Sequence, residues 1–145
     1  MSDWVVDSSV AAKWAVPEVD SAHARRLIDT VVPAGGRLYL LDVGLVEVVN
    51  VIWKYYHRRS ASLDDARQML TFLLSVPVQI VASNSLLPAA FELAVKHDCA
   101  VYDALFVQLA DDRGLPGLTA DEPLWKAVHG DYPQIQLLRL WTPPP

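Results

Sequence analysis

The fold is decided by residues 4–16, WVVDSSVAAKWAV, in which a short apolar strand leads directly into a helix. Trp4–Val6 predicts a buried strand that ends at Asp7, and residues 9–16 predict a helix that Pro17 terminates. The same alternation continues along the chain. Strands alternating with helices are typical of a parallel sheet covered by helices on both faces. We therefore expect an α/β fold with a central parallel sheet.

The remaining elements follow from apolar runs, periodicity and turn residues. Further strands are expected at residues 38–41, 78–81, 100–102, 118–119 and 135–140, and further helices at 20–32, 43–59, 62–75, 85–97, 103–113 and 122–128. Asp42, Ser62 and Ser85 are expected to be N-caps. Without an internal repeat or linker, residues 1–141 are predicted to be a single domain, followed by a proline-rich tail at 142–145.

Composition narrows the class of protein. The chain has 145 residues, 52% of them hydrophobic, a net charge of −5 and one cysteine, Cys99. This excludes the disordered class and an internal disulfide framework, and the acidic balance is opposite to the usual sign of nucleic-acid binding. Residues 68–91 carry no charge, but they contain Pro77 and Pro88 and change periodicity, so no membrane span is expected. Without a secretory signal, we expect a cytoplasmic protein with no membrane partner.

Three carboxylates directly follow predicted strands. They are Asp7 after residues 4–6, Asp103 after residues 100–102 and Asp121 after residues 118–119. An Asp at such a position commonly caps the next helix, and that explanation suffices for any one of them. Three together would place like charges at one edge of a parallel sheet, which is costly unless a cation neutralises them. We therefore expect a functional site at this edge.

Glu47 adds a fourth carboxylate from the predicted helix 43–59. Most of that helix is apolar, and its polar residues Glu47, Asn50, Lys54, His57 and Arg58 recur at i, i+3, i+7, i+10 and i+11. This spacing places them on one narrow stripe. An ordinary solvent-facing stripe remains an alternative, but we expect a mostly buried helix whose stripe lines a cleft, with Glu47 near the strand ends.

The four acids predict a site for a hard divalent cation. Mg²⁺ and Mn²⁺ prefer oxygen ligands, and no Cys–His or His–His spacing favours zinc. Carboxylate-held ions of this kind hydrolyse phosphodiesters by in-line attack of a water, without a protein nucleophile. Ser9 and Thr119 are hydroxyls that could orient Asp7 and Asp121, although each could equally be a cap or turn residue.

Four segments resemble the motifs of PIN-domain proteins, above all the ribonuclease toxins of VapBC-type toxin–antitoxin pairs. They are Val5-Val6-Asp7-Ser8-Ser9-Val10-Ala11-Ala12-Lys13-Trp14, Glu47-Val48-Val49-Asn50-Val51-Ile52-Trp53-Lys54, Tyr102-Asp103-Ala104-Leu105-Phe106-Val107 and Leu118-Thr119-Ala120-Asp121-Glu122-Pro123-Leu124. Their order and spacing agree with the family over residues 4–140. Each motif alone is weak, whereas four in register are specific.

The resemblance implies a three-layer α/β/α fold and Mg²⁺- or Mn²⁺-dependent endoribonuclease activity. It implies that Asp7, Glu47, Asp103 and Asp121 bind the metal, with Ser9, Asn50 and Thr119 as supporting polar groups. It further implies frequent homodimers and a cognate antitoxin whose C-terminal segment covers the acidic site. Apolar residues on helices 43–59 and 62–75 independently suggest a dimer face.

RNA binding by an acidic chain requires local rather than net positive charge. Candidate contacts are Lys13, Lys54 and Arg58, with Arg25, Arg26 and Arg59 as further possibilities; all could instead be solvated surface residues. Three other functions stay open at this point: a housekeeping RNA-processing nuclease, a phosphoacceptor receiver-like domain, and a non-catalytic module that binds a partner. The receiver-like function would need a lysine at a late strand end, where neither Lys96 nor Lys126 is expected.

Overall fold

One parallel sheet organises the protein. The computed structural model describes residues 2–144, and within that range the strands are β1 (Trp4–Val6), β2 (Leu38–Leu41), β3 (Val78–Val81), β4 (Gly117–Thr119) and β5 (Ile135–Leu137). Their order is β3-β2-β1-β4-β5, and each neighbouring pair is parallel. Met1 and Pro145, the ends of the predicted domain and tail, lie outside the described residues.

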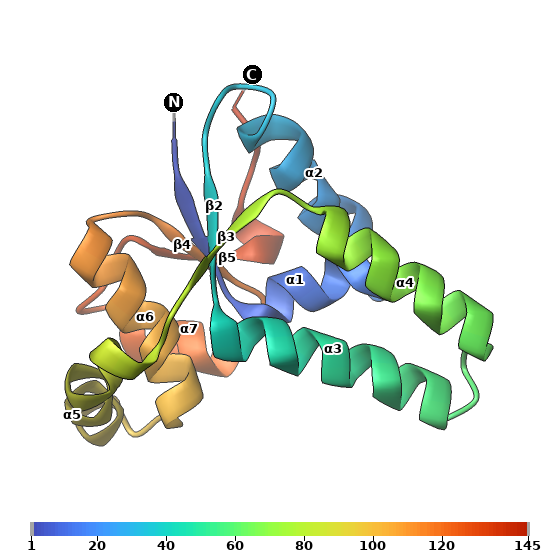
Figure 1. Ribbon diagram of the computed structural model, residues 1–145. Coiled ribbons are helices and arrows are strands. Elements are labelled where there is room, and N and C mark those ends of the chain that lie inside the picture. The colour runs from blue at the N-terminus through green and yellow to red at the C-terminus, as the bar shows by residue number, and fades with distance from the viewer. Residues whose placement is uncertain (1, 145) are drawn as a thin grey trace.

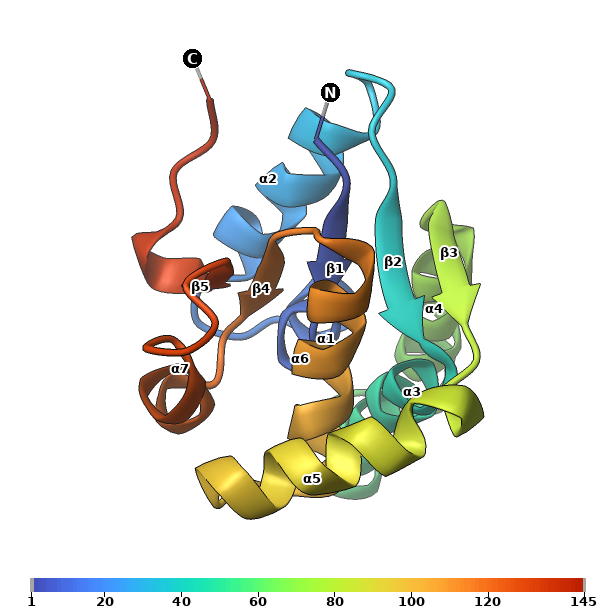
Figure 2. The same cartoon turned by 90° about the vertical axis from the view of Figure 1, so that its left-hand side faces the viewer.

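Helices cover both faces of the sheet, as Figures 1 and 2 show. One face carries α1 (Ser8–Ala15), α2 (Ser21–Val31), α3 (Asp42–His57) and α4 (Leu63–Ser75). The other face carries α5 (Leu87–His97), α6 (Val101–Arg113) and α7 (Glu122–Val128). The 3₁₀ turns η1 (Asn84–Leu86) and η2 (Leu138–Leu140) complete the elements in this range. The predicted three-layer α/β/α fold is confirmed.

Alternating side chains of the inner strands form two cores. Val5 and Tyr39 pack among residues of α5, α6 and α7, whereas Val6 and Leu40 pack with α1, α2 and α3 on the opposite face. Successive residues of a strand point to opposite faces, so a strand covered on both sides is apolar throughout. This is why Trp4–Val6 is an uninterrupted apolar run with a buried pattern.

Helices α3 and α4 form an antiparallel pair that projects beyond the sheet (Figure 1). In α3 only Gly44, Val48 and Ile52 are buried, whereas Val46 and Trp53 are 68% and 52% exposed. The prediction of a mostly buried helix was therefore wrong. The helix extends past the edge of the sheet, so its distal half packs only against neighbouring helices and leaves much of its surface exposed.

Several predicted ends also differ from the structure. Residues 100–102 form no strand, because Val101 already begins α6. The strand predicted at 135–140 ends at Leu137 and continues as η2. Asp42 is the first residue of α3 rather than its N-cap, and Ser85 lies inside η1 without capping α5. Ser62 does cap α4, since its Oγ accepts the Asp65 N–H at 3.0 Å.

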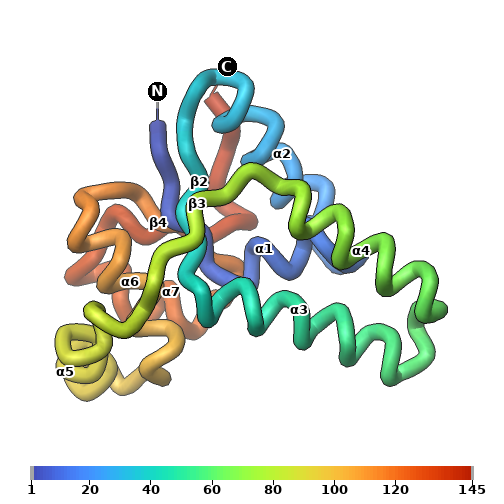
Figure 3. Tube along the Cα trace, viewed as in Figure 1, coloured from blue at the N-terminus to red at the C-terminus, as the bar shows by residue number. Residues whose placement is uncertain are grey.

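The Cα trace in Figure 3 places both ends of the described chain at the same end of the sheet. The carboxyl ends of the strands point the other way, toward the start of α1 and α3. Ligand sites of open parallel sheets lie beyond the carboxyl ends of the strands. Among residues 2–144, no helix is both long and apolar enough to cross a bilayer.

Candidate active site

The four predicted acids line one pocket at the carboxyl ends of the strands. Asp7 directly follows β1, Asp121 follows β4, Glu47 lies on α3 and Asp103 lies on α6. The pocket has a volume of about 320 Å³, and its lining also includes Asn50 and Lys54. Segments that lie far apart in the sequence thus contribute carboxylates to one cavity.

Asp103 reaches the pocket by a different route from the predicted one. It was expected to follow a strand, but it lies in the first turn of α6, whose N-cap position is Ala100. A carboxylate in the first turn is favoured by the partial positive charge of the helix N-terminus. Because α6 begins at the edge of the sheet where Asp7 and Asp121 lie, Asp103 lies close to them.

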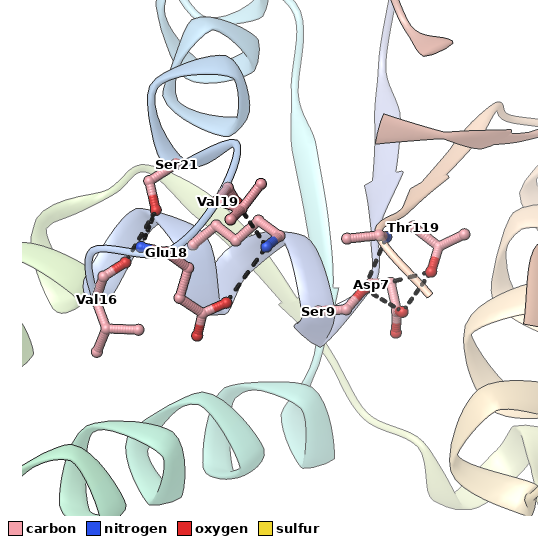
Figure 4. A network of polar contacts seen from close by, with 9 residues as sticks. Asp7, Ser9, Val16, Glu18, Val19, Ser21 and Thr119 are labelled. Carbon is pink, nitrogen blue, oxygen red and sulfur yellow. Dashed lines mark hydrogen bonds and ion pairs between the residues drawn. The ribbon is translucent and has the colours of Figure 1, made fainter. Parts of the chain in front are cut away.

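A network of hydroxyls holds Asp7 in place (Figure 4). Ser9 Oγ and Thr119 Oγ1 each donate a hydrogen bond to Asp7 Oδ2 at 2.7 Å. In turn, Ser9 Oγ accepts the Ala120 N–H at 2.9 Å, and Thr119 Oγ1 accepts the Asp121 N–H at 3.0 Å. The network joins β1 to β4 and fixes the carboxyl group of Asp7, which is only 7% exposed.

The capping explanation considered for these acids applies only to Asp121. Its Oδ1 accepts the Leu124 N–H at 3.0 Å and so caps α7. Asp7 occupies the N-cap position of α1 but makes no side-chain capping bond. Asp103 lies inside α6 rather than at its cap. Helix capping therefore leaves the gathering of the acids unexplained.

Burial and mutual repulsion make the pocket a poor place for uncompensated negative charge. Burial raises the pKa of Asp7, although hydrogen bonds from Ser9 and Thr119 oppose the rise. Burial, and then the charges of Asp7, Asp121 and Glu47, raise the pKa of Asp103 to about 6. Partial desolvation in the pocket and the charge of Asp7 also raise the pKa of Glu47. A cation in the pocket would relieve this repulsion.

The donor set fits a hydrated hard cation better than a closed metal cage. Its side chains are carboxylates, which suit Mg²⁺ and Mn²⁺. In residues 2–144, no group of three or more His, Cys, Asp or Glu side chains is arranged so that it could hold a metal ion. Mg²⁺ usually keeps several waters and binds proteins through one or two carboxylates, so the residues fit an ion of that kind.

The other predicted site residues divide into those at the pocket and those away from it. Asn50 and Lys54 line it, whereas Arg58 is the C-cap of α3 and lies outside its lining. Lys13 is also absent from the lining, and its Nζ donates to the Val19 carbonyl at 2.7 Å and pairs with Glu18 at 3.3 Å (Figure 4).

Sequence reasoning missed Ser8 as a pocket residue. Ser8 lines the acidic pocket, and a hydrogen bond from its side chain offsets part of the rise in the pKa of Glu47. The available signal was its position between Asp7 and Ser9, at the first residue of α1. A residue at the start of a helix that leaves a strand end faces the same edge of the sheet.

Comparisons with known proteins identify the family. The PIN domain model matches residues 4–128. Ribonuclease VapC3 of Pyrobaculum aerophilum is 37% identical over 122 residues, which are 83% of this chain and 90% of that protein. The chain belongs to the PIN-domain family, and the resemblance to VapC-type ribonucleases is confirmed.

Solved structures share the fold. PAE2754 from Pyrobaculum aerophilum superposes with a TM-score of 0.69 and 22% identity, covering 95% of this chain and 90% of that one. VapC20 of Mycobacterium tuberculosis, described as a sarcin-ricin loop cleaving toxin, gives a TM-score of 0.67 and 20% identity over 87% of this chain and 95% of that one. At this level of identity, the similarity establishes a common architecture.

Proposed function

We propose that this protein is an Mg²⁺- or Mn²⁺-dependent endoribonuclease that acts as the toxin of a toxin–antitoxin pair. The observation that carries the proposal is one pocket lined by Asp7, Glu47, Asp103 and Asp121. Its membership of the PIN-domain family and its 37% identity to a VapC ribonuclease support the nuclease activity. Metal dependence rests on the carboxylate donor set and on the repulsion among the acids.

The carboxylates of the pocket would bind and orient the metal ion, and the bound ion would supply the chemistry. When bound, such an ion lowers the pKa of a water and neutralises the charge that develops on the phosphate. Asp7 contributes a fixed carboxylate, because Ser9 and Thr119 both donate to its Oδ2. Asp103, with a pKa of about 6, is largely ionised at neutral pH and takes up a proton in mild acid, and positive charge in the pocket would favour its ionised form. Asn50 is proposed as a supporting polar group on the rim.

The substrate is proposed to be single-stranded or loop RNA. A small site engages splayed nucleotides more readily than a duplex. Lys54, which lines the pocket, and Arg58 are the proposed phosphate contacts. Lys13 is the weakest candidate of the predicted cations, since its ammonium is already bound to Glu18 and the Val19 carbonyl.

The proposed partners and location follow from the same assignment. A cognate antitoxin would cover the acidic pocket with a basic side chain, and the toxin would act in the cytoplasm. Residues 1–141 are proposed to be one nuclease domain with a short proline tail. A homodimer is proposed because exposed apolar residues occur on α3, α4 and also α5. They include Val46, Phe72, Leu74, Leu87, Phe91 and Val95. Light scattering tests the dimer.

The decisive experiment is cleavage of a single-stranded RNA by the purified protein. Activity is expected with Mg²⁺ or Mn²⁺ and none with a chelator. Asp7→Asn should abolish cleavage while retaining the fold by circular dichroism, whereas Asp112→Asn, on the exposed end of α6, is the matched control and should cleave normally. Cleavage by Asp7→Asn at the wild-type rate would refute the proposal.

Induced expression tests the biological role separately. The toxin should arrest growth, and co-expression of an adjacent small protein should restore it. Harmless expression of protein that is active in the test tube would instead favour a housekeeping RNA-processing nuclease with the same site.

A further inference from the structure

The distal half of α3 and the turn that follows it are positively charged in an otherwise acidic protein. Between Glu47 and Asp64 the sequence contains Lys54, Arg58 and Arg59 but no Asp or Glu, although the whole chain has a net charge of −5. All three cations are exposed. Among the ion pairs formed within residues 2–144, none involves them. A polyanion would meet uncompensated positive charge here.

The acids nearest in sequence to this region are partly occupied elsewhere. Asp64 and Asp65 lie in the first turn of α4. Asp64 pairs with Arg67 at 3.4 Å. Acids in a first turn also offset the positive end of their own helix dipole. The positive charge on α3 is therefore not cancelled by an ion pair across the tip of the helix pair.

An exposed aromatic stack lies among these cations. The rings of Trp53 and His57 are parallel within 10°, with centroids 4.7 Å apart. Trp53 is 52% exposed, so one face of its indole is covered by His57 and much of the rest meets solvent. Aromatic side chains of this kind are the surfaces on which unpaired bases stack. We name the surface formed by Trp53, Lys54, His57 and Arg58 the basic–aromatic strip.

The basic–aromatic strip continues directly from the acidic pocket. Lys54 lines that pocket together with Glu47. One turn further along the helix, His57 lines a second hollow of about 580 Å³ with Tyr56 and Arg59. The distance along α3 from Glu47 to His57 is about 15 Å at 1.5 Å per residue. A strand whose scissile phosphate lies at the acids can therefore extend along the helix.

We propose that the basic–aromatic strip binds the single strand of RNA that leaves the acidic pocket. Lys54 and Arg58 contact its phosphates, and Trp53, backed by His57, stacks one of its bases. The inference rests on the proposed function for the direction of the strand. It adds a base-binding subsite outside the acidic pocket, which would make cleavage depend on the length of the RNA.

A second stack in the same protein shows what is particular to the strip. Trp125 on α7 and His129 at its C-cap have the same i, i+4 spacing, with centroids 4.3 Å apart and planes within 13°. Such stacking therefore follows from helix geometry alone. The α7 pair lies in a hollow with Pro133 and Leu137, and neither of its residues lines the acidic pocket. It provides a matched control.

The test measures binding of a fluorescently labelled, unstructured RNA of about twelve nucleotides by anisotropy in a chelator, where no cleavage occurs. Loss of one stacked base is expected to raise the Kd of Trp53→Leu roughly tenfold, whereas Trp53→Phe should stay within about threefold of wild type. His57→Ala should weaken binding and His129→Ala should not. Thermal melting verifies that each variant is folded.

The outcomes separate this inference from the proposed function. Equal Kd values for wild type and folded Trp53→Leu would overturn it. The inference would also be overturned if Trp53→Leu kept the wild-type Kd but lost a dimer that light scattering detects for the wild type. A second copy of the chain would then cover the strip. RNA binding that depends on Trp53 in a wild-type protein that cleaves no RNA would support the strip and contradict the nuclease.

Discussion

Replacing Asp103 by asparagine should stabilise the metal-free protein while abolishing the proposed activity. The pKa of Asp103 rises from 3.8 to about 6 in the folded protein. One pKa unit corresponds to about 1.4 kcal/mol, so ionising Asp103 costs the folded state up to about 3 kcal/mol. The side chain is only partly buried, and the first turn of α6 favours its charge. We therefore expect Asp103→Asn to raise the free energy of unfolding by roughly 1–2 kcal/mol.

The sign of the pH dependence distinguishes this explanation from a general packing effect. An acid whose pKa is raised by folding destabilises the protein above the folded pKa, and this cost disappears as the pH falls below the unfolded value. The advantage of Asp103→Asn should thus be full at about pH 8 and vanish near pH 4. Urea titrations in a chelator at both pH values measure it.

Asp111→Asn, near the other end of α6, is the control for removing a carboxylate from the same helix. It should change stability by less than about 0.5 kcal/mol. If Asp103→Asn were no more stable than wild type at about pH 8, or if its advantage persisted at low pH, the repulsion inferred for the pocket would be wrong.

Three further predictions concern the hydroxyl network, the sheet and the metal. Thr119→Val removes a donor to Asp7 and an acceptor for the Asp121 N–H from a fully buried site. It should lower the free energy of unfolding by about 1–3 kcal/mol in urea titrations, and Thr119→Ser should recover most of that loss. An equally unstable Thr119→Ser would show that the methyl group matters more than the hydroxyl. A Cβ at Gly117 would lie 2.9 Å from both Ile135 Cδ1 and Phe106 Cζ, whereas one at Gly130 meets nothing within 4 Å. Gly117→Ala should therefore lower the free energy of unfolding by about 1–3 kcal/mol, and Gly130→Ala should not. Equal denaturation midpoints for the two variants would contradict this. The affinity for Mn²⁺, measured by calorimetry, should fall roughly tenfold from about pH 8 to pH 5, because Asp103 takes up a proton near pH 6. An affinity independent of pH would exclude Asp103 from the ion's surroundings.

The parallel sheet could be predicted because its strands are covered on both faces. Such strands are apolar without alternation, and the runs at Trp4–Val6 and Leu38–Leu41 both have this pattern and both form strands. The run at residues 100–102 is equally short and apolar but begins α6. A run of that length carries no period, so only tertiary packing decides between a strand and the first turn of a helix.

The site was easier to predict than some of the elements that carry it. Asp7 and Asp121 were found from strand ends, and Glu47 from its place on a polar stripe. Asp103 was found from an incorrect strand, because the start of α6 and the end of a strand occupy the same edge of the sheet. The exposure of Trp53 could not be predicted, since an apolar position on a helix indicates burial only where another element covers it.

The bonds from Thr119 to Asp7 and from Ala120 to Ser9 join residues 112 and 111 positions apart in the sequence. Asp7, the first of the four acids to be synthesised, therefore gains Ser9 as a partner at once but Thr119 only after most of the chain exists. During translation, a nascent chain that has reached α6 lacks both Thr119 and Asp121 and cannot complete the centre. Each copy therefore gains its complete acidic pocket only after β4 has left the ribosome, late in its own synthesis.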